Sequence, residues 1–253
     1  MNSVKEMICL RNAGFSYEKN KPILKDLSMI IREGESVGLI GANGTGKSTL
    51  MKILTGLLPH EGEVLIDGIP VNKKNLPEIR KKLGFVFQDS DSQLFMPTVY
   101  DDLAFGPRNY GMSREETDAC VDRALERTGI THLKYKQNYK MSGGEKRMAC
   151  IAVILAMSPE IILMDEPSIA LDPKNRRNLI NNLNAMEETK IIASHDLDMI
   201  LEVCDRVILL DQGEIRADGS PEMILRDREL LESCSLELPF CLQGYHPYKK
   251  EGK

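Results

Sequence analysis

The segment Gly41-Ala-Asn-Gly-Thr-Gly-Lys-Ser48 has the composition and spacing of a phosphate-binding loop, G-x-x-x-x-G-K-[ST]. Its glycines allow backbone N–H groups to turn inward around phosphate oxygens. The residues before it predict a buried strand, and those after it predict an amphipathic helix with a partly positive N-terminus. Lys47 would add a full charge at the β- and γ-phosphates, and Ser48 would offer a hydroxyl to Mg²⁺. We therefore expect a nucleotide to be bound here, by Gly41, Asn43, Gly44, Thr45, Gly46, Lys47, Ser48 and Thr49.

Two acidic residues, Asp165 and Glu166, follow the apolar stretch Ile161-Ile-Leu-Met164. In parallel α/β sheets, ligands bind at the carboxyl ends of the strands, where this pair would lie. A hard cation prefers carboxylate oxygen, so Asp165 can hold Mg²⁺. Glu166 is then placed to orient or deprotonate an attacking water. A solvated acidic loop would explain the pair taken alone, but together with the phosphate loop it predicts nucleotide hydrolysis.

A second anion-binding pattern occurs in Met141-Ser-Gly-Gly-Glu-Lys-Arg147, where Ser142 lies 23 residues before Asp165 and precedes a predicted helix. A serine and two glycines at a helix N-terminus can cradle a phosphate. One γ-phosphate does not need two such cradles from a single subunit. We therefore predict that two subunits face each other, each capping the nucleotide of the other with Ser142, Gly143 and Gly144.

Predicted strands and helices alternate in the order that a parallel α/β sheet requires, after a β-rich first third. The stretch from about 97 to 157 is predicted to be helical, with a capping box at Ser113 and Glu116. The expected fold class is therefore α/β, with one domain over residues 1–220 and an extension over 221–253. Candidate docking points in this polar extension are Leu236, Leu238, Pro239 and Phe240. Buried strands are expected at residues 37–41, 83–87, 161–164, 191–193 and 207–210, and a hairpin at 64–71.

Over roughly residues 7–220, the sequence resembles an ATP-binding cassette (ABC) ATPase. The resemblance implies the P-loop NTPase fold with a parallel-sheet core, an N-terminal antiparallel β subdomain and an α-helical insertion. It also implies ATP and Mg²⁺ as ligands, with Mg²⁺ held by Ser48, Gln88 and Asp165. By this resemblance, Tyr17 would stack on the adenine and Gln88 would sense Mg²⁺ and water. Asp172 would cross the dimer interface, His195 would contact the γ-phosphate, and Glu166 would act as the base.

Each of these roles has a plainer alternative. Tyr17 could be an ordinary strand aromatic, Gln88 a surface amide after a strand, and His195 a structural histidine. The sequence also departs from the family pattern at Glu145, where many members have glutamine, and at Met141, where many have leucine. The second change nearly conserves volume. The first exchanges an amide for a charge, which leaves open what position 145 contacts across the dimer.

The segment Gln88-Asp-Ser-Asp-Ser-Gln-Leu-Phe95 resembles the ATPase subunits of energy-coupling factor importers, of the cobalt-transport type. This resemblance implies a short helix around residues 93–95 that receives coupling helices from a membrane subunit. Leu94, Phe95 and Met96 form an apolar cluster beside the sensing loop, and an internal core contact is the alternative. The implied partners are a second ATPase subunit, a transmembrane coupling subunit and a substrate-binding membrane subunit. The implied location is peripheral, at the cytoplasmic face of the cell membrane.

Composition bears on the remaining alternatives. Acidic residues outnumber basic ones, 38 to 33, which gives a net charge of −5. This charge argues against a dedicated nucleic-acid binder, so no nucleic-acid partner is expected. No apolar run approaches the roughly 18 residues that span a bilayer, and the N-terminus lacks a signal-peptide core, so a soluble intracellular chain is expected. The six cysteines and four histidines lack metal-ligand spacing, which predicts free thiols and no structural metal.

Two other functional classes fit the sequence less well. Soluble ABC ATPases of translation or DNA repair usually carry two cassettes or a long coiled coil, whereas this chain has one cassette and about 60 residues of insertion. A P-loop kinase or GTPase would leave Ser142–Gly144 unexplained, and residues 72–75, Asn-Lys-Lys-Asn, lack the acid of a guanine-binding motif. The cargo, and the choice between a homodimer and a heterodimer, stay open from the sequence.

Overall fold

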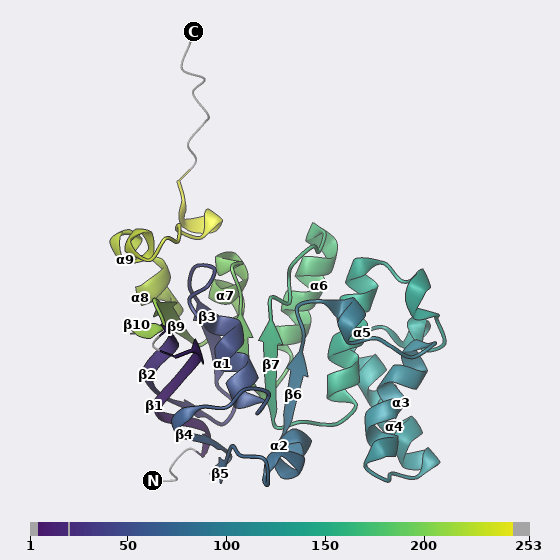
Figure 1. Ribbon diagram of the computed structural model, residues 1–253. Helices are drawn as coiled ribbons and strands as arrows, with labels where there is room; N and C mark the ends of the chain where they lie inside the picture. The colour runs from purple at the N-terminus through teal and green to yellow at the C-terminus, as the bar shows by residue number, and fades with distance from the viewer. Residues whose placement is uncertain (1–4, 20, 245–253) are drawn as a thin grey trace.

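The computed structural model describes residues 5–19 and 21–244, which form two β-sheets with helices around them (Figure 1). The last nine residues of the predicted extension, His246 among them, lie outside the described residues, as do the first four residues of the chain. The central sheet has six strands in the order β10-β9-β3-β8-β7-β6. All of its neighbouring strands pair in parallel except β10, which is antiparallel to β9. The bounds of its strands are β3 Ser36–Ile40, β6 Leu83–Val86, β7 Ile161–Asp165, β8 Thr189–Ala193, β9 Arg206–Asp211 and β10 Glu214–Gly219.

The central strands are buried on both faces, which explains their nearly continuous apolar sequences. In β7, Ile161 and Leu163 pack into one hydrophobic cluster, while Ile162 and Met164 pack into another on the opposite face. Successive side chains of a strand point to opposite faces, so this division follows directly from the two-residue period. The sheet is thus the middle layer between two cores.

The second sheet is antiparallel and has the order β2-β1-β4-β5. It shares its hydrophobic cluster with helix α1 and with one face of the central sheet. The predicted hairpin is confirmed, since β4 and β5 pair across Asp67 and Gly68, both of which have positive φ angles. The bounds are β1 Glu6–Glu18, β2 Lys21–Arg32, β4 Glu61–Ile66 and β5 Ile69–Pro70.

The predicted helical stretch contains α3, α4 and α5, which gather beyond β6, on the far side of the molecule from the antiparallel sheet (Figure 1). Ser113 and Glu116 form the expected capping box of α4, which ends at Gly129. Among the described residues, no helix is long and apolar enough to cross a membrane. The helices are α1 Lys47–Leu54, α2 Leu76–Lys82, α3 Val99–Asn109, α4 Arg114–Thr128, α5 Gly143–Leu155, α6 Pro173–Asn184, α7 Leu197–Val203, α8 Pro221–Leu225 and α9 Arg228–Ser233.

Two local expectations need correction. The short helix after Gln88 is a 3₁₀ turn at Ser90–Ser92, instead of a helix around residues 93–95, because the Asp89 carboxylate caps it and Gln93 turns inward. The start of the extension, expected to be polar, contains α8 and α9. These helices bury Ile224, Leu225 and Leu231 in the hydrophobic cluster that also contains Ile162 and Met164, which is called the main core below. Of the candidate docking points, Leu236 and Leu238 pack on that core and Pro239 is buried, while Phe240 is 80% exposed.

Candidate active site

Four loops of the candidate site follow the carboxyl ends of neighbouring parallel strands. Gly41 follows β3, Gln88 comes two residues after β6, Asp165 ends β7, and His195 comes two residues after β8. The register places Ala193 beside both Leu39 and Asp165. Because these strands run in parallel, their carboxyl ends meet at one edge of the sheet. A cleft of about 470 Å³ lies there, and its lining includes Tyr17, Asn43, Gly44, Gly46, Lys47, Ser48, Thr49, Gln88, Asp165, Glu166 and His195.

The phosphate loop has three glycines with positive φ angles, Gly41, Gly44 and Gly46, and at two of them a side chain would also clash. Gly41 has φ of 149°, and a Cβ there would lie 2.3 Å from the carbonyl oxygen of Leu210. Gly46, at the N-terminal end of α1, has φ of 107°, and a Cβ there would lie 2.4 Å from the Leu24 side chain. The sequence therefore forms a tight turn against β9 and β2, and this turn directs the N-terminus of α1 toward the cleft.

Lys47 is buried at the base of the cleft, with only 7% of its surface exposed. Its Nζ atom donates hydrogen bonds to the carbonyl oxygens of Gly41 and Ala42 at 2.6 and 3.0 Å. Burial lowers the pKa of Lys47 below its ordinary value, although the negative charges of Glu166 and Asp165 oppose this. The ammonium group is thus held by the loop at a position where it is poorly solvated, which strengthens its attraction to a polyanion.

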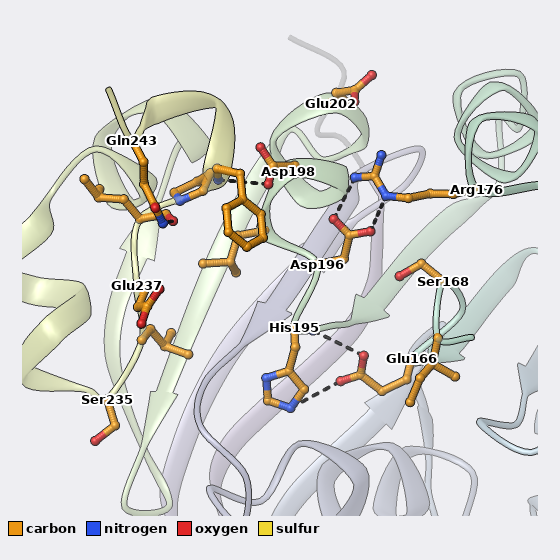
Figure 2. Close-up of a pocket in the computed structure, with 16 residues that line it drawn as sticks. Glu166, Ser168, Arg176, His195, Asp196, Asp198, Glu202, Ser235, Glu237 and Gln243 are labelled. Carbon is orange, nitrogen blue, oxygen red and sulfur yellow. Dashed lines mark hydrogen bonds and ion pairs between the residues drawn. The ribbon is translucent and has the colours of Figure 1, made fainter. Parts of the chain in front are cut away.

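Glu166 and His195 contact each other across the strand ends (Figure 2). The Glu166 carboxylate accepts hydrogen bonds from the backbone N–H of His195 at 3.2 Å and from the Ser194 hydroxyl at 3.4 Å. The Nε2 atom of His195 lies 3.4 Å from Glu166 Oε1 and 2.9 Å from Asn43 Oδ1. Glu166 also has a left-handed backbone, with φ of 48°, which is uncommon for a residue other than glycine. Such strain is found at functional sites, and here it turns the carboxylate toward the phosphate loop.

The helix that begins with Gly143 lies outside this cleft. Ser142 and Glu145 form a capping box, and the lining of this cleft includes none of Ser142, Gly143, Gly144 and Asp172. Gly143 instead lines a second, neighbouring cleft of about 280 Å³, which Gln88 also lines. Within the subunit, Gly144 packs against Asn175, since a Cβ on Gly144 would lie 2.4 Å from that side chain, while a Cβ on Gly143 would meet no atom within 4 Å among the described residues. The structure therefore does not place Ser142–Gly144 or Asp172 in the lining of the nucleotide cleft of the same subunit.

Asp172 caps helix α6 through the backbone N–H of Asn175. One turn further along α6, Arg176 donates two hydrogen bonds to Asp196, at 2.6 and 2.7 Å (Figure 2). Asp196 follows His195 directly and caps α7. This bidentate pair links α6, the helix that Asp172 caps, to the loop that carries His195.

Arg147 is a residue of this region that the sequence patterns did not single out. It is 3% exposed and donates hydrogen bonds from Nη1 to the Phe87 carbonyl oxygen at 2.7 Å and from Nη2 to the Gln88 carbonyl oxygen at 2.6 Å. Its guanidinium therefore fastens the loop of the exposed residue Gln88 to the helix that follows Ser142. Its helical spacing from Gly144, Met148 and Ile151 could have indicated that Arg147 is buried, because these residues lie on the same buried face of α5.

We expect Arg147→Lys to lower ATP hydrolysis about tenfold, because a single ammonium cannot reproduce the planar fork that contacts two carbonyl oxygens. The measurement is steady-state phosphate release. The control is Arg123→Lys on the exposed side of α4, which should leave the rate within twofold, or roughly 0.4 kcal/mol. An Arg147→Lys protein with the parental rate would show that this contact does not hold Gln88 in place.

Comparisons with known proteins agree with this architecture. A family model described as ABC transporter matches residues 24–169. A Geobacter sulfurreducens protein, provisionally named an ABC transporter ATP-binding protein, is 48% identical over 236 residues, or 93% of this chain and 95% of that protein. The energy-coupling factor transporter ATP-binding protein EcfA of Methanothermobacter thermautotrophicus is 44% identical over 92% of this chain and 77% of its own length.

Among solved structures, cbiO1 of Clostridium perfringens, described as part of the ABC transporter complex cbiONQ, aligns with a TM-score of 0.82. It is 34% identical, and the alignment covers 90% of this chain and 94% of that one. This chain therefore belongs to the ABC transporter ATPase family, whose cassettes hydrolyse ATP. The expected fold class is confirmed.

Proposed function

We propose that this chain is the ATP-hydrolysing subunit of an energy-coupling factor type importer, with cobalt as the first candidate cargo. The hydrolytic part rests on one observation, the convergence of Lys47, Asp165 and Glu166 on a single cleft. The importer part is supported by the similarity to EcfA and to cbiO1. Another metal or a vitamin is the alternative cargo, since specificity would reside in a membrane subunit.

The residues of the cleft fit ATP and Mg²⁺ chemically. Ser48, Gln88 and Asp165 supply hydroxyl, amide and carboxylate oxygens to one cleft, and these are the donors that Mg²⁺ prefers. The bound metal would supply charge neutralisation at the phosphates. Lys47 would hold the β- and γ-phosphates, Tyr17 would stack on the adenine, and His195 would contact the γ-phosphate. Glu166 would accept a proton from the attacking water, because its carboxylate is already fixed by Ser194 and the His195 backbone.

The complete site would need two subunits. Ser142, Gly143 and Gly144 do not line the nucleotide cleft of their own subunit, and we infer that they contact the γ-phosphate bound by a partner, with Asp172 crossing between the two. ATP would close the subunits face to face, and hydrolysis at Glu166 would reopen them. Every part of the site occurs once in this chain, so a homodimer with two competent sites is possible, and a heterodimer is the alternative.

The surface that would receive the membrane partner is smaller than the three-residue cluster at 94–96. Leu94 packs in the main core, as the internal alternative predicted, whereas Phe95 is 63% exposed. The Phe95 ring meets Phe105 of α3 edge to face, with 5.0 Å between ring centroids, and Phe105 is itself 42% exposed. Through the Gln93 side chain, which accepts a hydrogen bond from the Phe87 N–H, this exposed pair is connected to the loop of Gln88.

Replacing Phe95 by alanine is expected to reduce cargo uptake at least tenfold while the ATPase rate of the isolated chain stays within twofold, because an exposed ring at a docking site contributes on the order of 2 kcal/mol to binding. Uptake in cells and co-purification with the membrane subunits measure the effect. The control is Met223→Ala, since Met223 is also a large exposed apolar residue but lies on α8 and is not among the candidate docking points. Unchanged uptake would remove Phe95 from the coupling surface.

The function itself is tested by expressing the chain with the membrane subunits encoded near its gene and measuring uptake of cobalt, nickel and vitamins. ATP-dependent accumulation of one cargo, lost in the Glu166→Gln variant, is the expected result. If the chain co-purified with no membrane subunit and instead bound RNA or DNA in a salt-sensitive way, the importer assignment would be wrong.

A further inference from the structure

Lys136 and Glu145 form an ion pair beside the N-terminus of the helix that begins after Ser142. The Lys136 Nζ atom lies 2.8 Å from Glu145 Oε1 and 3.0 Å from Oε2. The same carboxylate accepts a hydrogen bond from the backbone N–H of Ser142 at 2.7 Å. The Lys136 hydrogen bond, followed by that from Ser142, lowers the pKa of Glu145, so this carboxylate is ionised at neutral pH.

An ionised carboxylate at this position conflicts with the proposed role of the helix N-terminus. Oε2 of Glu145 and a phosphate held by Ser142 and its neighbours would approach the same backbone turn, and two negative charges there repel each other. The first-turn N–H groups of a helix attract one anion, but Glu145 already occupies part of that positive end. A nearby positive charge is therefore needed for a second anion to be held well.

Two backbone hydrogen bonds fix Lys136 beside Glu145, where its positive charge offsets the negative charge of that carboxylate. The N–H of Lys136 donates to the Leu133 carbonyl oxygen at 2.8 Å, and its own carbonyl oxygen accepts from the N–H of Val99, the first residue of α3, at 3.1 Å. Its side chain is only partly exposed, which reduces screening by solvent. The preceding lysine, Lys134, forms an ion pair with a different residue, Asp122 of α4.

We propose that Lys136 is a positioning residue of the site in trans: it neutralises Glu145, so that the N-terminus of α5 accepts the γ-phosphate of ATP bound to a partner subunit. This inference rests on the proposed two-subunit site and deepens it. Lys136 acts through Glu145 and through the local charge, so its contribution depends on the carboxylate being present. Removing the charge at position 145 should make Lys136 dispensable.

The test measures ATP-induced dimerisation in the Glu166→Gln background, where hydrolysis does not reopen the dimer, by light scattering at increasing Mg-ATP. Lys136→Met should raise the half-maximal ATP concentration by about tenfold, because it leaves like charges unpaired at the interface. Adding Glu145→Gln should restore it to within about twofold, because glutamine also serves in a capping box. Lys136→Arg should behave as the parent, and Lys134→Met is the matched control with no effect.

The outcomes separate three cases. If Lys136→Met had no effect on dimerisation, or had the same effect in the presence of Glu145→Gln, the positioning role would be wrong. A merely structural role would lower the melting temperature of the nucleotide-free monomer and leave the ATP midpoint unchanged, which would also overturn the inference. If the Glu166→Gln protein stayed monomeric at all Mg-ATP concentrations, the two-subunit site would fail, and this inference would fail with it.

Discussion

Glu166→Gln is expected to reduce ATP hydrolysis by about 10²–10⁴-fold, the usual contribution of a general base, while ATP binding is retained. Glutamine has the same length and can still accept the hydrogen bonds that the His195 N–H and the Ser194 hydroxyl donate to position 166. It adopts the left-handed backbone, φ of 48°, about as readily as glutamate does. The lost property is therefore the ability to take a proton from water.

Phosphate release and nucleotide affinity, measured on the same preparation, separate these effects. The control is Glu222→Gln, which makes the same chemical change at an exposed position of α8 and should leave both quantities unchanged. We also expect Glu166→Gln protein to accumulate as a dimer with excess Mg-ATP, because closed subunits no longer reopen. Hydrolysis at the parental rate would exclude Glu166 as the base.

The arrangement of the cleft could be predicted because it depends on strand direction. Gly41, Gln88, Asp165 and His195 each lie at or just after the end of an apolar strand, and the strands are parallel. Parallel strands bring their carboxyl ends to the same edge whatever the strand order is. Local signals such as the Ser113–Glu116 capping box were equally dependable, since all the atoms involved lie within one helical turn.

Contacts between distant segments could not be predicted in the same way. Arg147 reaches the carbonyl oxygens of Phe87 and Gln88 across 60 and 59 positions of sequence, and no periodic pattern specifies such a pairing. The difference in burial between Leu94 and Phe95 has a similar cause. They follow a single 3₁₀ turn, where neither the helical nor the strand period applies, so the sequence did not indicate which side chain faces the core.

Both helices of the extension are preceded by capping residues, which are a sequence signal for a helix start. Ser220 precedes Pro221, and its side chain accepts from the Met223 N–H, while Asp227 caps α9 through the Leu230 N–H. With 5 and 6 residues, these helices are too short to show an amphipathic period. Their stability comes from Leu225 and Leu231, which are fully buried against the rest of the domain.

Lys47→Met is expected to weaken Mg-ATP binding by about 10- to 100-fold, because charge-assisted hydrogen bonds contribute roughly 1.5–3 kcal/mol each. Methionine has a similar length and no charge. The ammonium of Lys47 is held at the base of the cleft by the carbonyl oxygens of Gly41 and Ala42, and no other lysine or arginine lines this cleft among the described residues. Isothermal titration calorimetry with Mg-ATP measures the loss.

The fold should tolerate this change, which separates binding from stability. Burial lowers the pKa of Lys47, so the folded state holds this charge at a cost that methionine removes. Against this gain, the carbonyl oxygens of Gly41 and Ala42 lose a donor, and an unpaired buried acceptor costs about 1–3 kcal/mol, so the two effects on the free energy of unfolding oppose each other. The melting temperature should therefore change little.

The matched control is Lys52→Met, the same substitution at an exposed position of α1 about 1.4 turns further along the helix. It should leave ATP affinity unchanged, because Lys52 does not line the nucleotide cleft. If Lys47→Met and Lys52→Met bound Mg-ATP equally well, the cleft would not be the nucleotide site. A Lys47→Met protein with lost binding and an unchanged melting temperature would instead place ATP at this ammonium, whose Nζ atom lies 3.5 Å from His195 Nε2.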